Sequence, residues 1–84
     1  MPLSKYERKE RLPYGEQSKI AADLTTREGV KYTEAFVSLV MNDKVEQLDP
    51  ERVHKVRVEI ARRLRPRASV ADAFPDPTPA ALAG

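Results

Sequence analysis

The stretch QSKIAADLTTREGVKYTEAFVSLVMN, residues 17–42, sets the architecture of this chain. Its first part places Ile20, Ala21 and Leu24 at the i, i+1, i+4 spacing of a helix with one buried face. The polar segment TTREG follows and ends at Gly29, which suits a sharp turn because glycine adopts a positive φ without steric cost. The helical period then restarts. The stretch therefore predicts two helices joined by a polar connection.

The second predicted helix, residues 32–42, has an apolar side and a polar side. The apolar side consists of Tyr32, Phe36, Val37, Val40 and Met41, and the opposite side of Lys31, Glu34, Ala35, Ser38 and Asn42. A helix whose apolar side is fixed in a core presents its small polar side rigidly enough to enter the major groove of DNA. The two helices together are typical of a helix-turn-helix motif.

The same residues resemble a known family. Gln17, Ala21 and Leu24, followed by VSLVMN at 37–42, are similar to the lambda-repressor/Cro-like and lac-repressor-headpiece class of DNA-binding domains, in which the recognition helix often ends in Val-Ser-x-Val-hydrophobic-Asn. The resemblance implies a small prokaryotic or phage transcriptional regulator. The connection is longer here than is usual in that class, so either the turn is extended or the first helix runs on through Arg27.

A third helix is predicted after the motif. The segment DPE at 49–51 combines an N-cap residue, a proline in the first turn and an acid that opposes the helix dipole. The apolar stripe of this helix consists of Val53, Val56, Ile60 and Leu64. Pro66 ends the helix at Arg65.

Before the motif, Tyr14 is expected to close one end of the core.

The flanking segments divide the chain into three parts. Residues 1–13 are a charged N-terminal extension, for which a loosely attached, solvated segment is favoured. The alternatives are a short helix from Ser4 to Arg11, which would begin with a capping box of Ser4 and Glu7, and an arm that neutralises DNA phosphates. Residues 14–67 are the helix-turn-helix DNA-binding domain. Residues 68–84 are rich in proline and alanine and predict a flexible, disordered tail. The predicted fold class is all-α, a small bundle of three core helices.

Length and composition exclude several classes of protein. With 84 residues the chain has room for one small domain. It contains no cysteine, which removes disulfides and thiolate metal sites and agrees with a reducing cytoplasm. Its single histidine, His54, cannot form a metal site alone, and no apolar run is long enough for a membrane span or a signal peptide. We expect a cytoplasmic protein without metal, cofactor or membrane contact.

The candidate DNA contacts lie on and around the second helix. They are Lys31, Thr33, Glu34, Ser38, Asn42, Lys44 and Arg27. Ser38 and Asn42 can donate or accept at base edges, and Thr33 and Glu34 lie where recognition helices usually touch bases. The three basic residues are expected to neutralise phosphates. The alternative is that these side chains form a soluble face without a partner.

The sequence thus predicts a sequence-specific DNA-binding regulator, expected to be a repressor, that inserts the helix at residues 32–42 into the major groove. The expected partner is double-stranded DNA with a short inverted repeat, bound by a homodimer, because one module touches too few bases for tight specific binding. The alternative is an antitoxin-like or adaptor module that binds protein through the same fold. Catalysis is not expected, since Ser38 has no neighbouring base in the sequence to activate it and no glycine-rich phosphate loop is present.

Overall fold

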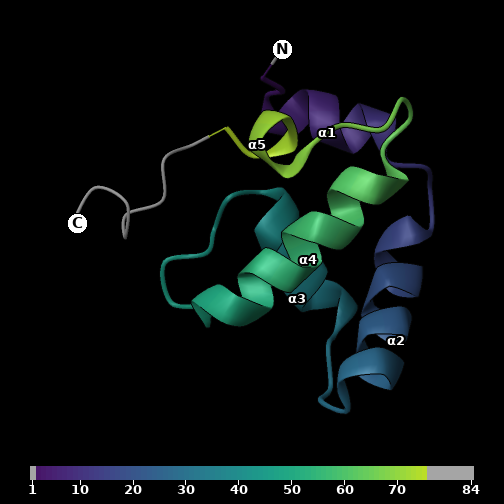
Figure 1. Ribbon diagram of the computed structural model, residues 1–84, viewed down its shortest axis with the longest axis vertical. Helices are drawn as coiled ribbons and strands as arrows, with labels where there is room; N and C mark the ends of the chain where they lie inside the picture. Colours follow the sequence, from purple (N-terminus) through teal and green to yellow (C-terminus); the bar gives the residue numbers. More distant parts are fainter. Residues whose placement is uncertain (1, 76–84) are drawn as a thin grey trace.

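The computed structural model describes residues 2–75, which contain five α-helices and no strand. The helices are α1 (Lys5–Arg11), α2 (Glu16–Glu28), α3 (Glu34–Met41), α4 (Pro50–Arg63) and α5 (Val70–Ala73). In the view of Figure 1, α4 crosses in front of α3, α2 runs along one side, and α1 and α5 lie together at the top. The all-α prediction is confirmed, and α2, α3 and α4 are the three predicted core helices.

One hydrophobic core joins these helices. The predicted stripe of α4 is buried along its length, from Val53 through Val56 and Ile60 to Leu64 just beyond the helix. It packs with buried side chains of α2 and α3 that the helical periods also predicted: Ile20, Ala21, Leu24, Val37, Val40 and Met41. Burial of each large apolar side chain contributes about 1.5–3 kcal/mol as an upper value. This core fixes the inner side of α3.

The connection between α2 and α3 is organised by Thr25. Its hydroxyl donates to the carbonyl oxygen of Ala21 at 2.8 Å and accepts from the N–H of Tyr32 at 2.8 Å. The helix therefore continues through Thr25 to Glu28 and ends at Gly29, whose φ is 73°. Of the two alternatives for this segment, the longer first helix is the one observed. The hydroxyl also holds the chain that enters α3 against α2.

Both ends of the described chain pack into the core, which corrects two predictions. Leu3 and Leu12, on either side of α1, are buried, so the extension at residues 1–13 is not a loosely attached segment. The short-helix alternative is observed, with the predicted capping box between Ser4 and Glu7. The segment after residue 68 forms α5 and buries Phe74, so it is not flexible up to that point. Residues 76–84 of the predicted tail lie outside the described residues.

The side chain of Arg8 joins these two ends to α3. It is 1% exposed, and its guanidinium donates to the carbonyl oxygens of Ala73 and Met41, both at 2.8 Å. The same group pairs with Asp43 at 2.8 Å and lies 4.3 Å from the centre of the Phe74 ring. A buried cation is tolerated only when it is paired and hydrogen-bonded in this way. The burial of both ends follows from these contacts.

Replacement of Phe74 tests the docking of α5. Phe74→Ala should lower the free energy of unfolding by about 3–5 kcal/mol, because it empties a core position and removes the ring from beside Arg8. Urea and thermal denaturation followed by circular dichroism measure the change. Tyr6→Ala is the matched control, since Tyr6 is 68% exposed and its loss should change stability by less than about 0.5 kcal/mol. Equal denaturation midpoints for Phe74→Ala and Tyr6→Ala would contradict the docking of α5.

Candidate nucleic-acid interface

α3 turns one stripe of side chains away from the core. Ala35 and Leu39 are exposed, and Ser38 and Asn42 are half-buried. These residues follow the i, i+3, i+4, i+7 spacing of one helix face. Leu39 belongs to this outer face although the helical wheel assigned it to neither side. The stripe formed by Ala35, Ser38, Leu39 and Asn42 is called the α3 face below.

Hydrogen bonds at the two ends of α3 use side chains that the sequence assigned to DNA. Thr33 is the N-cap of α3, and its side chain accepts from the N–H of Phe36 at 3.1 Å. Asn42 is the C-cap, and its amide nitrogen donates to the carbonyl oxygen of Ser38 at 2.8 Å. The helix is therefore shorter than the predicted range of 32–42. These bonds define its ends and reduce the polar groups that the α3 face offers to a partner.

An exposed lysine lies at each end of α3. Lys31 lies just before the helix and Lys44 just after it, and neither forms an ion pair within the described part of the chain. The N–H of Lys44 donates to the carbonyl oxygen of Leu39 at 2.9 Å, which folds the chain back against the end of α3. Glu34, at the first position of α3, is the exposed acid of this segment. The structure thus places an uncharged face between two free cations.

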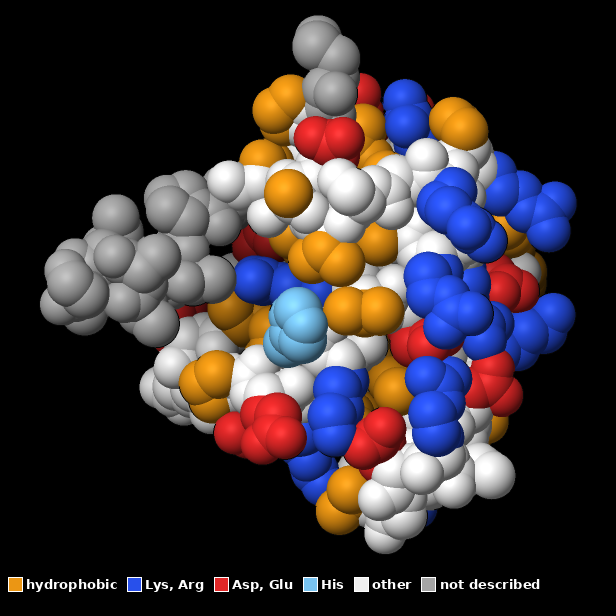
Figure 2. All heavy atoms as spheres, viewed as in Figure 1, with side chains coloured by type: hydrophobic (Ala, Val, Ile, Leu, Met, Phe, Trp, Pro, Cys, Tyr) orange, Lys and Arg blue, Asp and Glu red, His pale blue; other side chains and the backbone are white. Residues whose placement is uncertain are grey.

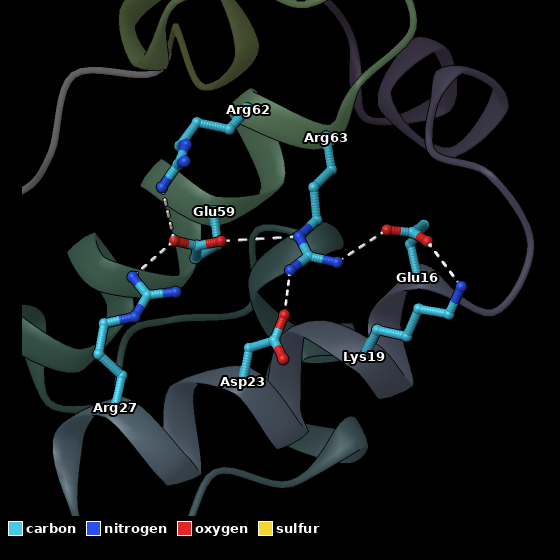
Figure 3. A network of polar contacts seen from close by, with 7 residues as sticks. All are labelled: Glu16, Lys19, Asp23, Arg27, Glu59, Arg62 and Arg63. Carbon is cyan, nitrogen blue, oxygen red and sulfur yellow. Dashed lines mark hydrogen bonds and ion pairs between the residues drawn. The ribbon is translucent and has the colours of Figure 1, made fainter.

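Arg27 is not part of this group, because it forms an ion pair between α2 and α4. Its guanidinium donates to Glu59 at 2.8 Å, and Glu59 also accepts from Arg62 at 3.2 Å (Figure 3). Arg63 extends the network from α4 back to the carboxylates of Glu16 and Asp23 on α2. The prediction of a phosphate contact for Arg27 overlooked this pairing. The network fixes the angle at which α2, and with it α3, lies on α4.

The carboxylate of Glu59 is the centre of that network. The residue is 3% exposed, and burial by itself would raise its pKa. The hydrogen bond donated by Arg27 and the charges of Arg27, Arg62 and Arg63 act in the opposite direction and prevail, so the pKa of Glu59 lies below its ordinary value of 4.5. The group is charged at neutral pH and holds the arginines around it.

A hollow at the start of α2 borders the first residue of α3. It is lined by Lys9, Leu12, Pro13, Tyr14, Gly15, Gln17, Ser18 and Glu34. Gly15 has a φ of 86° and is the N-cap of α2, which has no side-chain cap. Tyr14 is fully exposed, contrary to the expectation that it closes the core. Tyr14 lies in the short connection between α1 and α2, where its side chain points to solvent.

Within residues 2–75, no group of histidine and acidic side chains could hold a metal ion, and no helix is long and apolar enough to cross a membrane. No protein-family model, curated protein or solved structure matches this chain. The α3 face and its surroundings form the candidate site.

Replacement of Glu59 tests the network that orients α2. Glu59→Gln should lower the free energy of unfolding at pH 7 by roughly 1–3 kcal/mol, because charge-assisted hydrogen bonds are lost. The pKa of Glu59 is lowered in the folded state, so its contribution is complete above the unfolded value and disappears as the pH falls through the folded value. The difference from the wild type should therefore shrink below pH 4.5.

Urea denaturation at a series of pH values measures this difference. Glu51→Gln is the control, because Glu51 lies on the same helix and its side chain is 79% exposed. It should have a small effect at every pH. A Glu59→Gln difference that stays constant down to the acid transition would show that the carboxylate charge does not hold the network.

Proposed function

We propose that this protein is a small DNA-binding transcriptional regulator, of the repressor type, that presents α3 to the major groove. The observation that carries the proposal is the small uncharged α3 face between the unpaired cations Lys31 and Lys44. The major groove is about 12 Å wide and is bordered by two phosphate backbones. An α-helix with its side chains is about 10–12 Å in diameter, so α3 can enter the groove, and the cations beyond its two ends can contact the phosphates.

The surroundings of α3 support this proposal. The hollow beside Glu34 brings the uncapped N-terminus of α2 and the side chain of Lys9 close to the start of α3. Backbone N–H groups at a helix N-terminus and a nearby ammonium group both favour a phosphate, whereas the Glu34 carboxylate in the same hollow opposes one. A duplex seated on α3 would place its backbone near this end of the molecule. Phosphate contacts there would set the position of α3 in the groove.

The opposite side of the molecule is a weaker candidate for DNA. Figure 2 views the molecule from the α4 side, where lysine and arginine side chains lie among carboxylates. Several of these basic groups are paired: Arg62 and Arg63 with Glu59, and Lys55 with Glu28 at 2.5 Å. Paired charges gain less from a phosphate because they already have a partner. This side is best understood as a solvated surface that stabilises the bundle.

The proposal includes a homodimer on a short inverted repeat. One helix of this length contacts only a few base pairs, which limits both affinity and specificity. Two copies related by a twofold axis would place their α3 helices in successive major grooves, one helical turn apart. The size of the protein–DNA complex, measured by analytical ultracentrifugation, tests this part separately.

A protein partner is the second candidate, and one observation favours it. Leu39 is 38% exposed and Val30, in the α2–α3 connection, is 44% exposed. Exposed apolar side chains on and beside α3 also suit a protein surface, as in an antitoxin-like or adaptor module. The free lysines favour DNA. Salt-dependent binding to duplex DNA separates the two candidates.

The two lysines provide the test of DNA binding. Lys31→Ala and Lys44→Ala should each weaken binding to all duplex sequences and reduce the slope of log affinity against log salt by about one phosphate contact. The measurement is fluorescence anisotropy with a labelled duplex at several salt concentrations. Lys31→Arg keeps the charge and should keep the slope.

Lys55→Ala is the matched control for net charge. It removes one positive charge from α4, where the ammonium group pairs with Glu28, and should leave the slope nearly unchanged. An equal loss of slope in all three alanine variants would indicate a general charge effect and not the α3 site. A wild-type chain without salt-dependent affinity for DNA would overturn the proposed function in favour of a protein partner.

A further inference from the structure

The middle of the α3 face is apolar. Leu39 is 38% exposed, whereas the other large aliphatic residues of α3, Val37, Val40 and Met41, are each 0% exposed. Ala35 is exposed one helical turn before Leu39. Residues at i and i+4 are neighbours on a helix surface, with Cβ atoms about 5–6 Å apart. Together, Ala35 and Leu39 present a small continuous apolar surface to solvent.

Two of the polar side chains near this surface, Thr33 and Asn42, form hydrogen bonds within the protein. The Thr33 side chain accepts from the N–H of Phe36, and the Asn42 amide donates to the carbonyl oxygen of Ser38. The free cations, Lys31 and Lys44, lie beyond the ends of the helix. At the centre of α3, Ala35 and Leu39 therefore offer apolar contact to the floor of a groove, beside the hydroxyl of Ser38.

Only one base presents an apolar group in the major groove. Thymine carries a C5 methyl group there, whereas the other base edges carry donors and acceptors. A leucine placed against the edge of guanine or cytosine would remove water from polar atoms without replacing the lost hydrogen bonds, which is unfavourable. Against a thymine methyl group, the same side chain buries apolar surface on both partners.

We infer that Ala35 and Leu39 read thymine methyl groups in the major groove, so that T·A pairs facing the centre of α3 determine the preferred site. This inference rests on the proposed function and adds the chemical group that is recognised. It assigns specificity to two residues that sequence patterns did not identify as contacts. The lysines at the helix ends supply affinity without sequence preference.

Replacement of thymine by deoxyuridine tests the inference directly. Duplexes enriched by the wild-type chain from random sequence are synthesised again with deoxyuridine at every thymine, which removes the methyl groups and keeps all base-pairing and groove hydrogen-bonding atoms. Wild-type affinity should fall about fourfold for each contacted methyl group, which corresponds to about 0.8 kcal/mol. The salt slope should not change, because no charge is altered.

A double-mutant cycle assigns the effect to Leu39. Leu39→Ala should lower affinity for the thymine duplex by about fourfold or more and should bind the uracil duplex nearly as well as the wild type does. Leu39→Met keeps most of the apolar surface and should keep the discrimination. Tyr6→Ala is the control, since it removes an exposed apolar side chain from α1. If Leu39→Ala fails to fold, the wild-type comparison of the two duplexes decides alone.

The outcomes separate this inference from the proposed function. The wild-type chain could bind DNA selectively and with salt dependence, yet have equal affinity for thymine and uracil duplexes. That result would overturn methyl recognition and leave DNA binding in place. Failure of the wild-type chain to enrich any duplex would overturn both. A loss on uracil substitution that is unchanged in Leu39→Ala would exclude Leu39 as the reading residue.

Discussion

The buried guanidinium of Arg8 is the interaction on which the arrangement of the helices depends. It donates hydrogen bonds to the backbone carbonyl oxygens of Ala73 and Met41. It also pairs with the carboxylate of Asp43 and lies over the ring of Phe74. A charge removed from water is stable only when it is paired and hydrogen-bonded, so the loss of one of these contacts weakens the others. Asp43 has a φ of 61°, a conformation uncommon for residues other than glycine, and this places its carboxylate beside Arg8. The end of α3 is therefore fixed by the same group that fixes α1 and α5.

The beginning of α3 is held by a different set of contacts. The hydroxyl of Thr25 binds the backbone of Tyr32, and the ion pairs around Glu59 set α2 against α4. Between these two anchors, Val37 and Val40 are fully buried. An exposed helix face can discriminate between bases only if its side chains hold their positions, and small side chains such as Ala35 depend entirely on the backbone for this. The contacts that hold both ends of α3 therefore suit the proposed recognition of DNA.

Local sequence patterns predicted what local contacts determine. The stripe of α4 and the inner sides of α2 and α3 followed from the helical period, and the capping box of α1 followed from Ser4 and Glu7. The burial of Arg8 was not predicted, because in a segment of alternating charge it resembles a solvated side chain. Its partner Ala73 is 65 positions away in the sequence. Arg27 was assigned to DNA for the same reason, since Glu59 is 32 positions away. Cation burial and ion pairing over such separations are set by tertiary structure and leave no periodic signal.

The outer side of α3 was predicted, but several details of the candidate site were not. Ala35, Ser38 and Asn42 followed from the helical wheel, and the two lysines remain predicted DNA contacts. Thr33 and Asn42 are residue types that often cap helices, so their capping roles can be recognised from the sequence. Leu39 could not be assigned from the wheel because it lies at the border of the apolar side. Its exposure depends on how α4 covers α3, which the spacing of residues in one helix cannot determine.

The shortness of α1 and α5 has a consequence for how this protein opens. Helices of seven and four residues are far below the length at which a helix is stable alone in water. Each persists because the other completes the surroundings of Arg8, and the N–H of Leu3 also donates to the carbonyl oxygen of Asp72 at 2.8 Å. If either helix detaches, the other keeps a charge or an aromatic ring without its partners. The two ends of the described chain therefore form and melt as one cooperative unit, although they lie at opposite ends of its sequence.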